Sequence, residues 1–145
     1  MTAAVVQWAA ARSDIAAVAL VGSWARGEAR PDSDVDFMLL TFHPAAYRAD
    51  TGWQDAIAWP GATVAAWEDA DYGAAWSRHL FLTSGTEVEL CFALPAWAAV
   101  NPIDAGTRAV AGRGCRILYD PQGLLARLLA ALSEENPHNA PQRDD

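Results

Sequence analysis

The segment VGSWARGEARPDSDVDFMLL, residues 21–40, decides the fold of this chain. An apolar run over residues 15–21 leads into Gly22–Ser23, and a second apolar run over residues 37–40 follows the pair Asp34 and Asp36. Continuous apolar runs of this length are typical of strands that are covered on both faces. The segment therefore predicts two buried strands, with polar groups where the first strand ends and where the second begins.

The connection between these two strands carries helix and turn signals. We expect a short helix over residues 24–29 with Ser23 as its N-cap, because a serine hydroxyl can accept a hydrogen bond from a free N–H group of the first helical turn. Pro31 ends this helix, since the residue before a proline is biased away from helical backbone. Asp32 and Ser33 favour a turn. The second strand is expected over residues 34–41.

The polar residues of this segment suit phosphate and metal. Gly22 and Ser23 offer free backbone N–H groups and a hydroxyl at a helix start, which is a favourable environment for phosphate. Asp34 and Asp36 are two positions apart on a predicted strand, so their side chains leave the same face about 6.6 Å apart. Two carboxylates can converge there on one or two hard cations, as they do in sites that transfer phosphoryl groups.

Helices and strands alternate in the rest of the chain. The expected ranges are 2–12 (helix), 47–59 (helix or loop), 62–72 (strand), 78–83 and 87–93 (strands joined by a hairpin at Ser84–Gly85), 95–110 (helix, interrupted near Pro102), 115–120 (strand) and 122–133 (helix). This mixture predicts an α/β (α+β) fold, a single-layer mixed β-sheet packed by helices. We expect one domain over residues 1–135 and a disordered polar tail over residues 136–145.

Composition excludes some partners and locations. Acidic residues outnumber basic ones by 18 to 10, and the net charge is −8. A nucleic-acid partner is not expected, because phosphate backbones are bound by clustered lysine and arginine. The run over residues 15–21 is too short to span a bilayer, and no basic residue precedes the first apolar stretch, as it would in a signal peptide. We therefore expect a cytoplasmic protein with no membrane partner.

Cysteines and tryptophans give weaker signals. Cys91 and Cys115 lie in predicted strands and are expected to be reduced core residues. No His/Cys cluster has the spacing of zinc ligands, and neither a Rossmann nor a Walker glycine pattern occurs. Two interpretations of the tryptophans stay open, since aromatic side chains can wall an acceptor pocket or fill the core, and the core is the more frequent use. The tryptophans concerned are Trp53, Trp59, Trp67, Trp76 and Trp97.

The quoted segment resembles the signature of the nucleotidyltransferase superfamily, whose members share a DNA polymerase β-like palm fold. That signature is Gly-Ser, a spacer, and Asp-x-Asp at the start of a strand. Gly22, Ser23, Asp34 and Asp36 stand at its positions, with residues 24–33 as the spacer.

Further residues resemble the small, minimal nucleotidyltransferase branch of this superfamily. Arg26 and Gly27 match its additional Arg-Gly, and Ser33 matches the serine that often precedes the first aspartate. The sequence RILYDP, residues 116–121, followed by a predicted helix, is also similar to the ending of small members. The resemblance implies that Gly22, Ser23, Arg26 and Ser33 bind the nucleotide, ATP by default, and that the aspartates hold Mg²⁺ or Mn²⁺.

The resemblance also implies a third carboxylate on a neighbouring strand. Glu87 and Glu89 share one face of the predicted strand over residues 87–93. We favour Glu89 because it lies further from the turn, between Val88 and Leu90. The family often has aspartate at this position, so a glutamate is a departure from its pattern. The alternative is that both glutamates face solvent on an edge strand.

The implied activity is metal-dependent transfer of a nucleoside monophosphate, AMP from ATP, onto an acceptor hydroxyl with release of pyrophosphate. One acceptor is a small molecule, for example an antibiotic, in a pocket completed by the middle of the chain or by a homodimer mate. Another is a protein, as in minimal nucleotidyltransferases that act as antitoxins by adenylylating a toxin. A third alternative is nucleotide binding without turnover, against which the three filled carboxylate positions argue. The long tryptophan-rich middle segment favours the small molecule.

Overall fold

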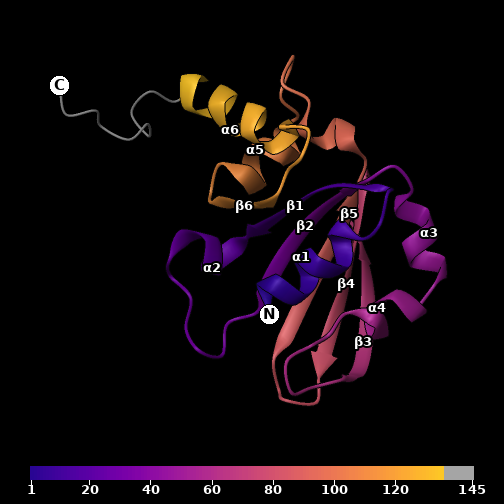
Figure 1. Ribbon diagram of the computed structural model, residues 1–145. Helices are drawn as coiled ribbons and strands as arrows, with labels where there is room; N and C mark the ends of the chain where they lie inside the picture. Colours follow the sequence, from indigo (N-terminus) through magenta and orange to yellow (C-terminus); the bar gives the residue numbers. More distant parts are fainter. Residues whose placement is uncertain (136–145) are drawn as a thin grey trace.

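A computed structural model describes residues 1–135, and the predicted tail over residues 136–145 lies outside the described part. Six strands form one sheet in the order β3-β4-β5-β2-β1-β6 (Figure 1). Their bounds are β1 Ile15–Val21, β2 Val35–Thr41, β3 Val64–Asp71, β4 Ala75–Leu82, β5 Glu87–Ala93 and β6 Cys115–Tyr119. β2 and β5 are parallel, and the other neighbouring pairs are antiparallel. The expected single-layer mixed sheet packed by helices is therefore confirmed.

Helices cover the two faces of the sheet unequally. α1 (Thr2–Ala10), α3 (Pro44–Ala49) and α4 (Gly52–Ala56) lie on the face that is nearer in Figure 1. Trp8, Tyr47 and Trp53 from these helices join the apolar side chains of that face in one buried cluster. The 3₁₀ turn η1 (Pro95–Ala98), α5 (Ala105–Ala111) and α6 (Leu124–Glu135) cover part of the opposite face and form a second cluster.

The two strands of the decisive segment form where expected. β1 has the predicted bounds, and all of its residues are buried, because the strand is central in the sheet and covered on both faces. β2 begins one residue later than predicted, so that Asp34 immediately precedes the strand. β5 also has its predicted bounds, and it lies between β4 and β2. The alternative that placed Glu87 and Glu89 on an edge strand is therefore wrong.

The helix after β1 differs from the expectation. α2 spans Gly22–Arg26, and its N-cap is Val21, which makes no side-chain capping hydrogen bond. The prediction of Ser23 as the N-cap is wrong, because the chain enters the helix directly from the strand. Gly27 follows with φ +72°, and its N–H group bonds to the carbonyls at the end of the helix. This left-handed position accounts for the glycine of the Arg-Gly pair.

A buried arginine fastens the middle of the chain to the sheet. Arg78 on β4 has no exposed surface, and its guanidinium donates to both carboxylate oxygens of Asp69 at 2.8 and 3.0 Å. It also donates to the backbone carbonyls of Arg48 and Asp50 and to the side chain of Gln54. These bonds hold α3 and α4 against the sheet, in a segment where the sequence predicted helix or loop over residues 47–59.

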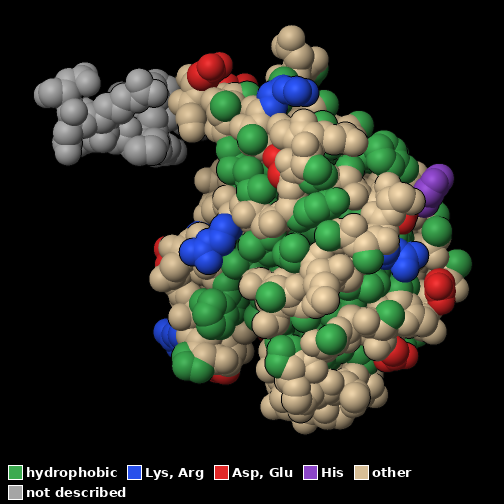
Figure 2. Space-filling model, viewed as in Figure 1, with side chains coloured by type: hydrophobic (Ala, Val, Ile, Leu, Met, Phe, Trp, Pro, Cys, Tyr) green, Lys and Arg blue, Asp and Glu red, His purple; other side chains and the backbone are tan. Residues whose placement is uncertain are grey.

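The tryptophans of the middle segment are mainly core residues. Trp53, Trp59 and Trp76 are buried in the cluster of the near face, and Trp67 lies over the guanidinium of Arg78, 4.1 Å from ring centroid to carbon. Figure 2 shows hydrophobic side chains gathered toward the centre of this face and charged ones toward its margins. In the described part of the chain, no helix is long and apolar enough to cross a membrane.

Candidate active site

Polar side chains form a row across the sheet on the face that α5 and α6 only partly cover. Asp36 on β2 pairs with Glu89 on β5, and Glu89 pairs with His79 on β4. Residues that stand opposite each other in neighbouring strands point to the same face. On the other side of Asp36, the row continues to Val21, which immediately precedes Gly22. The register therefore places the predicted third carboxylate, Glu89, beside Asp36.

The environment of Asp36 disfavours the ionised form of its carboxyl group. Burial and then the neighbouring charges of Glu89 and Asp34 raise the pKa of Asp36 to about 6, while His79 and Arg26 act in the opposite direction. Clustered carboxylates that lack a compensating cation raise each other's pKa values in this way. A divalent cation supplies the missing positive charge, and Mg²⁺ and Mn²⁺ prefer oxygen ligands. The donor set at Asp36 and Glu89 therefore fits the metal that the resemblance implies.

Gly22 lies directly against Asp36. A Cβ atom at position 22 would be 2.3 Å from Oδ2 of Asp36, and the φ angle of Gly22 is +74°. Only glycine combines this backbone conformation with so close an approach. The chain thus turns from β1 into α2 at the edge of the carboxylate pair, with the N–H groups at the start of α2 near it.

The other residues predicted to bind nucleotide differ in their surroundings. Ser23 lies in the first turn of α2, and its hydroxyl has no hydrogen-bond partner among residues 1–135. Arg26 lines the cavity beside Asp36 and also pairs with Glu28, Nε to Oε2 at 3.2 Å. The Ser33 hydroxyl accepts from the backbone N–H of Arg30 at 2.8 Å, so it fixes the turn before Asp34.

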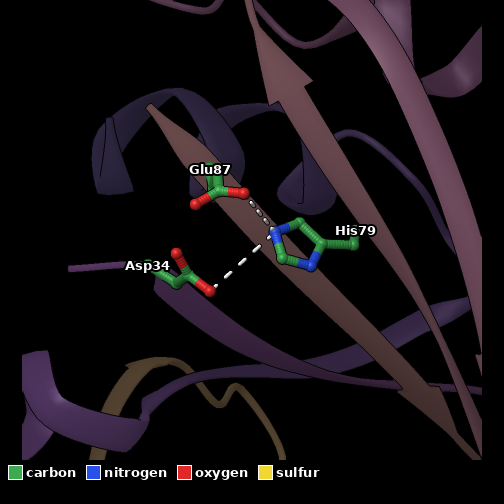
Figure 3. Close-up of side chains that lie close together, drawn as sticks. All are labelled: Asp34, His79 and Glu87. Carbon is green, nitrogen blue, oxygen red and sulfur yellow. Dashed lines mark ion pairs between the residues drawn. The ribbon is translucent and has the colours of Figure 1, made fainter. Parts of the chain in front are cut away.

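Asp34 turns toward two residues outside the predicted set. Its Oδ2 lies 3.8 Å from Nε2 of His79, and Oε1 of Glu87 lies 3.5 Å from the same nitrogen. Figure 3 shows these three side chains converging from the start of β2, from β4 and from β5. In the described part of the chain, they are the one group of three whose metal-ligating atoms all lie within 4.8 Å of one another. Asp34, Asp36 and Glu89 do not form so tight a group.

A cavity of about 560 Å³ opens over the row of polar residues. Gly22, Arg26, Asp36 and Glu89 line one part of it, and the opposite wall comes from η1 and α5. Of the five tryptophans considered above, Trp97 alone lines this cavity, so the interpretation of the middle tryptophans as its walls is wrong. They pack on the other face because Tyr47, Phe92 and Arg78 surround them there.

Two residues of the site were missed by the sequence analysis. Tyr72, in the turn between β3 and β4, donates its hydroxyl to Oε1 of Glu89 at 3.1 Å. His79 follows the buried Arg78 and faces the carboxylates. The alternation of β4 places His79 and Phe81 on one face and Arg78 on the other. Together with the register of the β4–β5 hairpin, that alternation is the signal that could have found His79.

Cys91 lines the cavity but is not suited to nucleophilic chemistry. Burial and then the charge of Glu89 raise the pKa of its thiol to about 12, and a thiol reacts as a nucleophile only as the thiolate. Cys91 and Cys115 are both free, as predicted. Both are partly buried.

Comparison with known families agrees with the geometry. The family model described as "Nucleotidyltransferase domain" matches residues 6–66, which include β1, α2 and β2 and therefore Gly22, Ser23, Asp34 and Asp36. No curated protein sequence matches the chain significantly. The matched segment carries the motif, and the mixed sheet brings its glycine and its second aspartate into contact. The match over residues 6–66 supports membership of the chain in the nucleotidyltransferase superfamily.

Proposed function

We propose that this protein transfers AMP from ATP to the hydroxyl group of a small-molecule acceptor, for example an antibiotic, and releases pyrophosphate. The observation that carries the proposal is the placement of Asp36 and Glu89 side by side on the floor of a cavity that also contains Gly22 and Arg26. Cavities of about 300–1,000 Å³ accommodate ligands of nucleotide size. Because the proposed reaction uses ATP, the proposal includes a cytoplasmic location.

Different residues of the chain would bind different parts of ATP. The free hydroxyl of Ser23 and the backbone N–H groups at the start of α2 would hold the β- and γ-phosphates. Arg26 would neutralise phosphate charge from the wall of the cavity. Asp36, Glu89 and Asp34 are the residues that would hold Mg²⁺ or Mn²⁺, which when bound neutralises the triphosphate and polarises the reacting phosphate.

Glu89 would accept the proton of the acceptor hydroxyl. The acceptor oxygen forms a bond to the α-phosphorus, the bond from that phosphorus to the bridging oxygen breaks, and pyrophosphate leaves. The acceptor proton passes to the Glu89 carboxylate, which the Tyr72 hydroxyl orients through its hydrogen bond to Oε1. Positioning and charge neutralisation supply most of the rate in such transfers.

A protein hydroxyl is the second candidate acceptor. Tyr72 and Val110 line the cavity and are also exposed to solvent. Apolar side chains at the rim of a cavity suit contact with another protein as well as with a small molecule.

The two acceptors are separated by incubating the full chain with ATP labelled at the α-phosphate. One reaction contains pools of hydroxyl-bearing small molecules, and another contains the products of neighbouring genes. Label on a small molecule supports the proposal, and label on a protein supports the second candidate. ATP that binds without any transfer, in the presence of Mg²⁺ and every acceptor tested, would instead indicate a nucleotide-binding protein.

A further inference from the structure

His79, Asp34 and Glu87 converge at the edge of the proposed active site without belonging to the carboxylate pair described above. Asp34 immediately precedes β2, Glu87 begins β5, and His79 lies on β4 (Figure 3). The ring of His79 stacks on Phe81 with centroids 4.7 Å apart and 5° between the planes. This stacking fixes the plane of the imidazole ring.

The Nε2 atom of His79 is buried and has no hydrogen-bond partner among the described residues. It faces Oε1 of Glu87 at 3.5 Å and Oδ2 of Asp34 at 3.8 Å. An ionised carboxylate only accepts hydrogen bonds, and a neutral imidazole nitrogen without a proton also only accepts. Three such acceptor atoms facing one another need either a hydrogen on Nε2 or a metal ion between them.

The distances favour a metal ion over a proton. A charge-assisted N–H···O bond brings nitrogen and oxygen to about 2.7–2.9 Å, and both separations here are longer. Tetrahedral coordination with bonds of about 2.1 Å places neighbouring ligand atoms roughly 3.4 Å apart. The separations of 3.5 and 3.8 Å from Nε2 are close to that edge length, and the ligand atoms of the three residues all lie within 4.8 Å of one another.

We infer that Asp34, His79 and Glu87 form a second cation site, one for a divalent transition-metal ion of the Zn²⁺ or Mn²⁺ class. An imidazole ligand suits these ions, whereas Mg²⁺ and Ca²⁺ prefer oxygen alone. Three protein ligands leave a coordination position open for water or another group. The inference does not rest on the proposed transfer of AMP, since it concerns binding of the ion by the protein alone.

Asp34 links this site to the nucleotide site. Its Oδ2 is directed to His79, and Asp34 is also one of the residues that would hold the cation of the nucleotide. A residue that takes part in two sites would couple their binding, and such coupling is reciprocal. Binding of a transition metal at His79 is therefore expected to change the affinity of the protein for nucleotide with Mg²⁺. Binding of nucleotide with Mg²⁺ should change the affinity for the transition metal by the same factor.

The test is a titration of the metal-free, untagged full chain with Co²⁺, followed by visible absorption, and with Zn²⁺, followed by calorimetry, both without nucleotide. We expect one tightly bound ion per chain, with d–d bands whose intensity indicates four- or five-coordination, and only weaker binding at Asp36 and Glu89. His79→Gln and Glu87→Gln should each weaken binding at least tenfold. Asp36→Asn, Glu89→Gln and the exposed-histidine control His43→Gln should retain it.

Two results would overturn the inference. One is the absence of Co²⁺ and Zn²⁺ binding by the wild-type chain. The other is binding that His79→Gln and Glu87→Gln preserve and Glu89→Gln or His43→Gln removes, since the ion would then lie elsewhere. Thermal melts of each variant establish that it is folded, and Glu87→Gln tests the site even if the histidine variant is unstable. Loss of AMP transfer alone, with Co²⁺ binding intact, would count against the proposed function and leave this site standing.

Discussion

Asp36 and Glu89 stand directly opposite each other in the parallel pairing of β2 and β5. Their side chains share the face that lines the cavity, and after burial the charge of Glu89 is the largest influence that raises the pKa of Asp36. Repulsion between two carboxylates held together in this way lowers the free energy of unfolding when no cation is bound. The stability of the metal-free protein therefore measures the repulsion between these two carboxylates.

The first prediction concerns Asp36 and pH. The pKa of Asp36 is about 6 in the folded chain against 3.8 for an ordinary aspartate, so folding favours its protonated form. The stability that this proton contributes is present at about pH 4 and is lost as the pH rises through 6. In metal-free buffer, Asp36→Asn should therefore melt higher than the wild type near neutral pH and at nearly the same temperature in acid. The measurement is a series of thermal melts across this range.

Excess Mg²⁺ is the control for this comparison. Because a bound cation compensates the charge of Asp36, the advantage of Asp36→Asn at neutral pH should shrink or reverse. A variant that melts below the wild type at neutral pH without metal would show that the carboxylate is already compensated by the protein.

The second prediction compares two glycines with similar backbone angles. Gly22 and Gly27 have φ angles of +74° and +72°, so alanine strains the backbone at both positions. A new Cβ at position 22 meets Asp36, whereas nothing lies within 4 Å of one at position 27. We expect each substitution to cost about 1 kcal/mol of stability or more, and Gly22→Ala alone to abolish Mg²⁺-dependent binding of ATP. Equal loss of ATP binding in both variants would show that the contact of Gly22 with Asp36 does not determine ATP binding.

The third prediction concerns the Ser23 hydroxyl. Because it bonds to no described residue and does not cap α2, Ser23→Ala should leave the melting temperature nearly unchanged. Binding of ATP should weaken by about tenfold, which corresponds to about 1.4 kcal/mol, near the lower end of the range for one hydrogen bond to a charged group. Calorimetry with ATP and with AMP separates the contribution of the β- and γ-phosphates to binding from that of the rest of the nucleotide, since AMP lacks these two phosphates. An equal effect on both ligands, or a fall in melting temperature as large as the loss of binding, would remove Ser23 from the phosphate site.

The fourth prediction concerns Arg78, which has no exposed surface and binds Asp69 through two hydrogen bonds. Lysine carries the same charge but lacks the planar group of donors that reaches Asp69, Gln54 and two carbonyls together. Arg78→Lys should destabilise the chain by about 3–5 kcal/mol, because lysine leaves at least two buried acceptors without a hydrogen bond, each at a cost of about 1–3 kcal/mol. Denaturant unfolding measures this cost. Arg116→Lys on β6 is the control and should cost less than about 0.5 kcal/mol.

The sequence was informative where a signal is local. The apolar run of β1 ends at a glycine, and β5 is bounded by the turn at Gly85, so both strands have the expected bounds. Gly22, Asp34 and Asp36 are close together in the chain, and their spacing alone indicated a phosphate and metal site. The start of α2 was not predictable in this way, because Gly22 enters the helix from a left-handed backbone angle that no capping rule anticipates.

The position of His79 depends on register, which the sequence does not determine. A two-residue turn at Ser84–Gly85 would place Leu80 opposite Glu89. The structure has a loop over residues 83–85, closed by the hydrogen bond from Leu82 N–H to the Thr86 carbonyl, and this register places His79 opposite Glu89 instead. A shift of one residue exchanges the two faces of a strand. The side on which the tryptophans pack depends in the same way on contacts between distant segments.

The last prediction separates Glu89 from Glu87, which share one face of β5 and differ in their partners. Glu89 lies beside Asp36 and accepts a hydrogen bond from Tyr72, whereas Glu87 lies 3.5 Å from His79. Because Glu89 is the proposed proton acceptor, Glu89→Gln should lower AMP transfer by at least about 100-fold. ATP should still bind, since Asp34 and Asp36 remain.

Glutamine keeps an oxygen that can accept from Tyr72 and removes one negative charge beside Asp36, so the metal-free Glu89→Gln chain should be as stable as the wild type or more stable. Glu87→Gln is the matched control, one step along the same face of the same strand. With Mg²⁺ as the added metal, it should transfer AMP at nearly the wild-type rate. Transfer that survives in Glu89→Gln but fails in Glu87→Gln would reverse the two roles. Transfer that survives in both would exclude β5 from the chemistry and leave the β2 aspartates as its acidic groups.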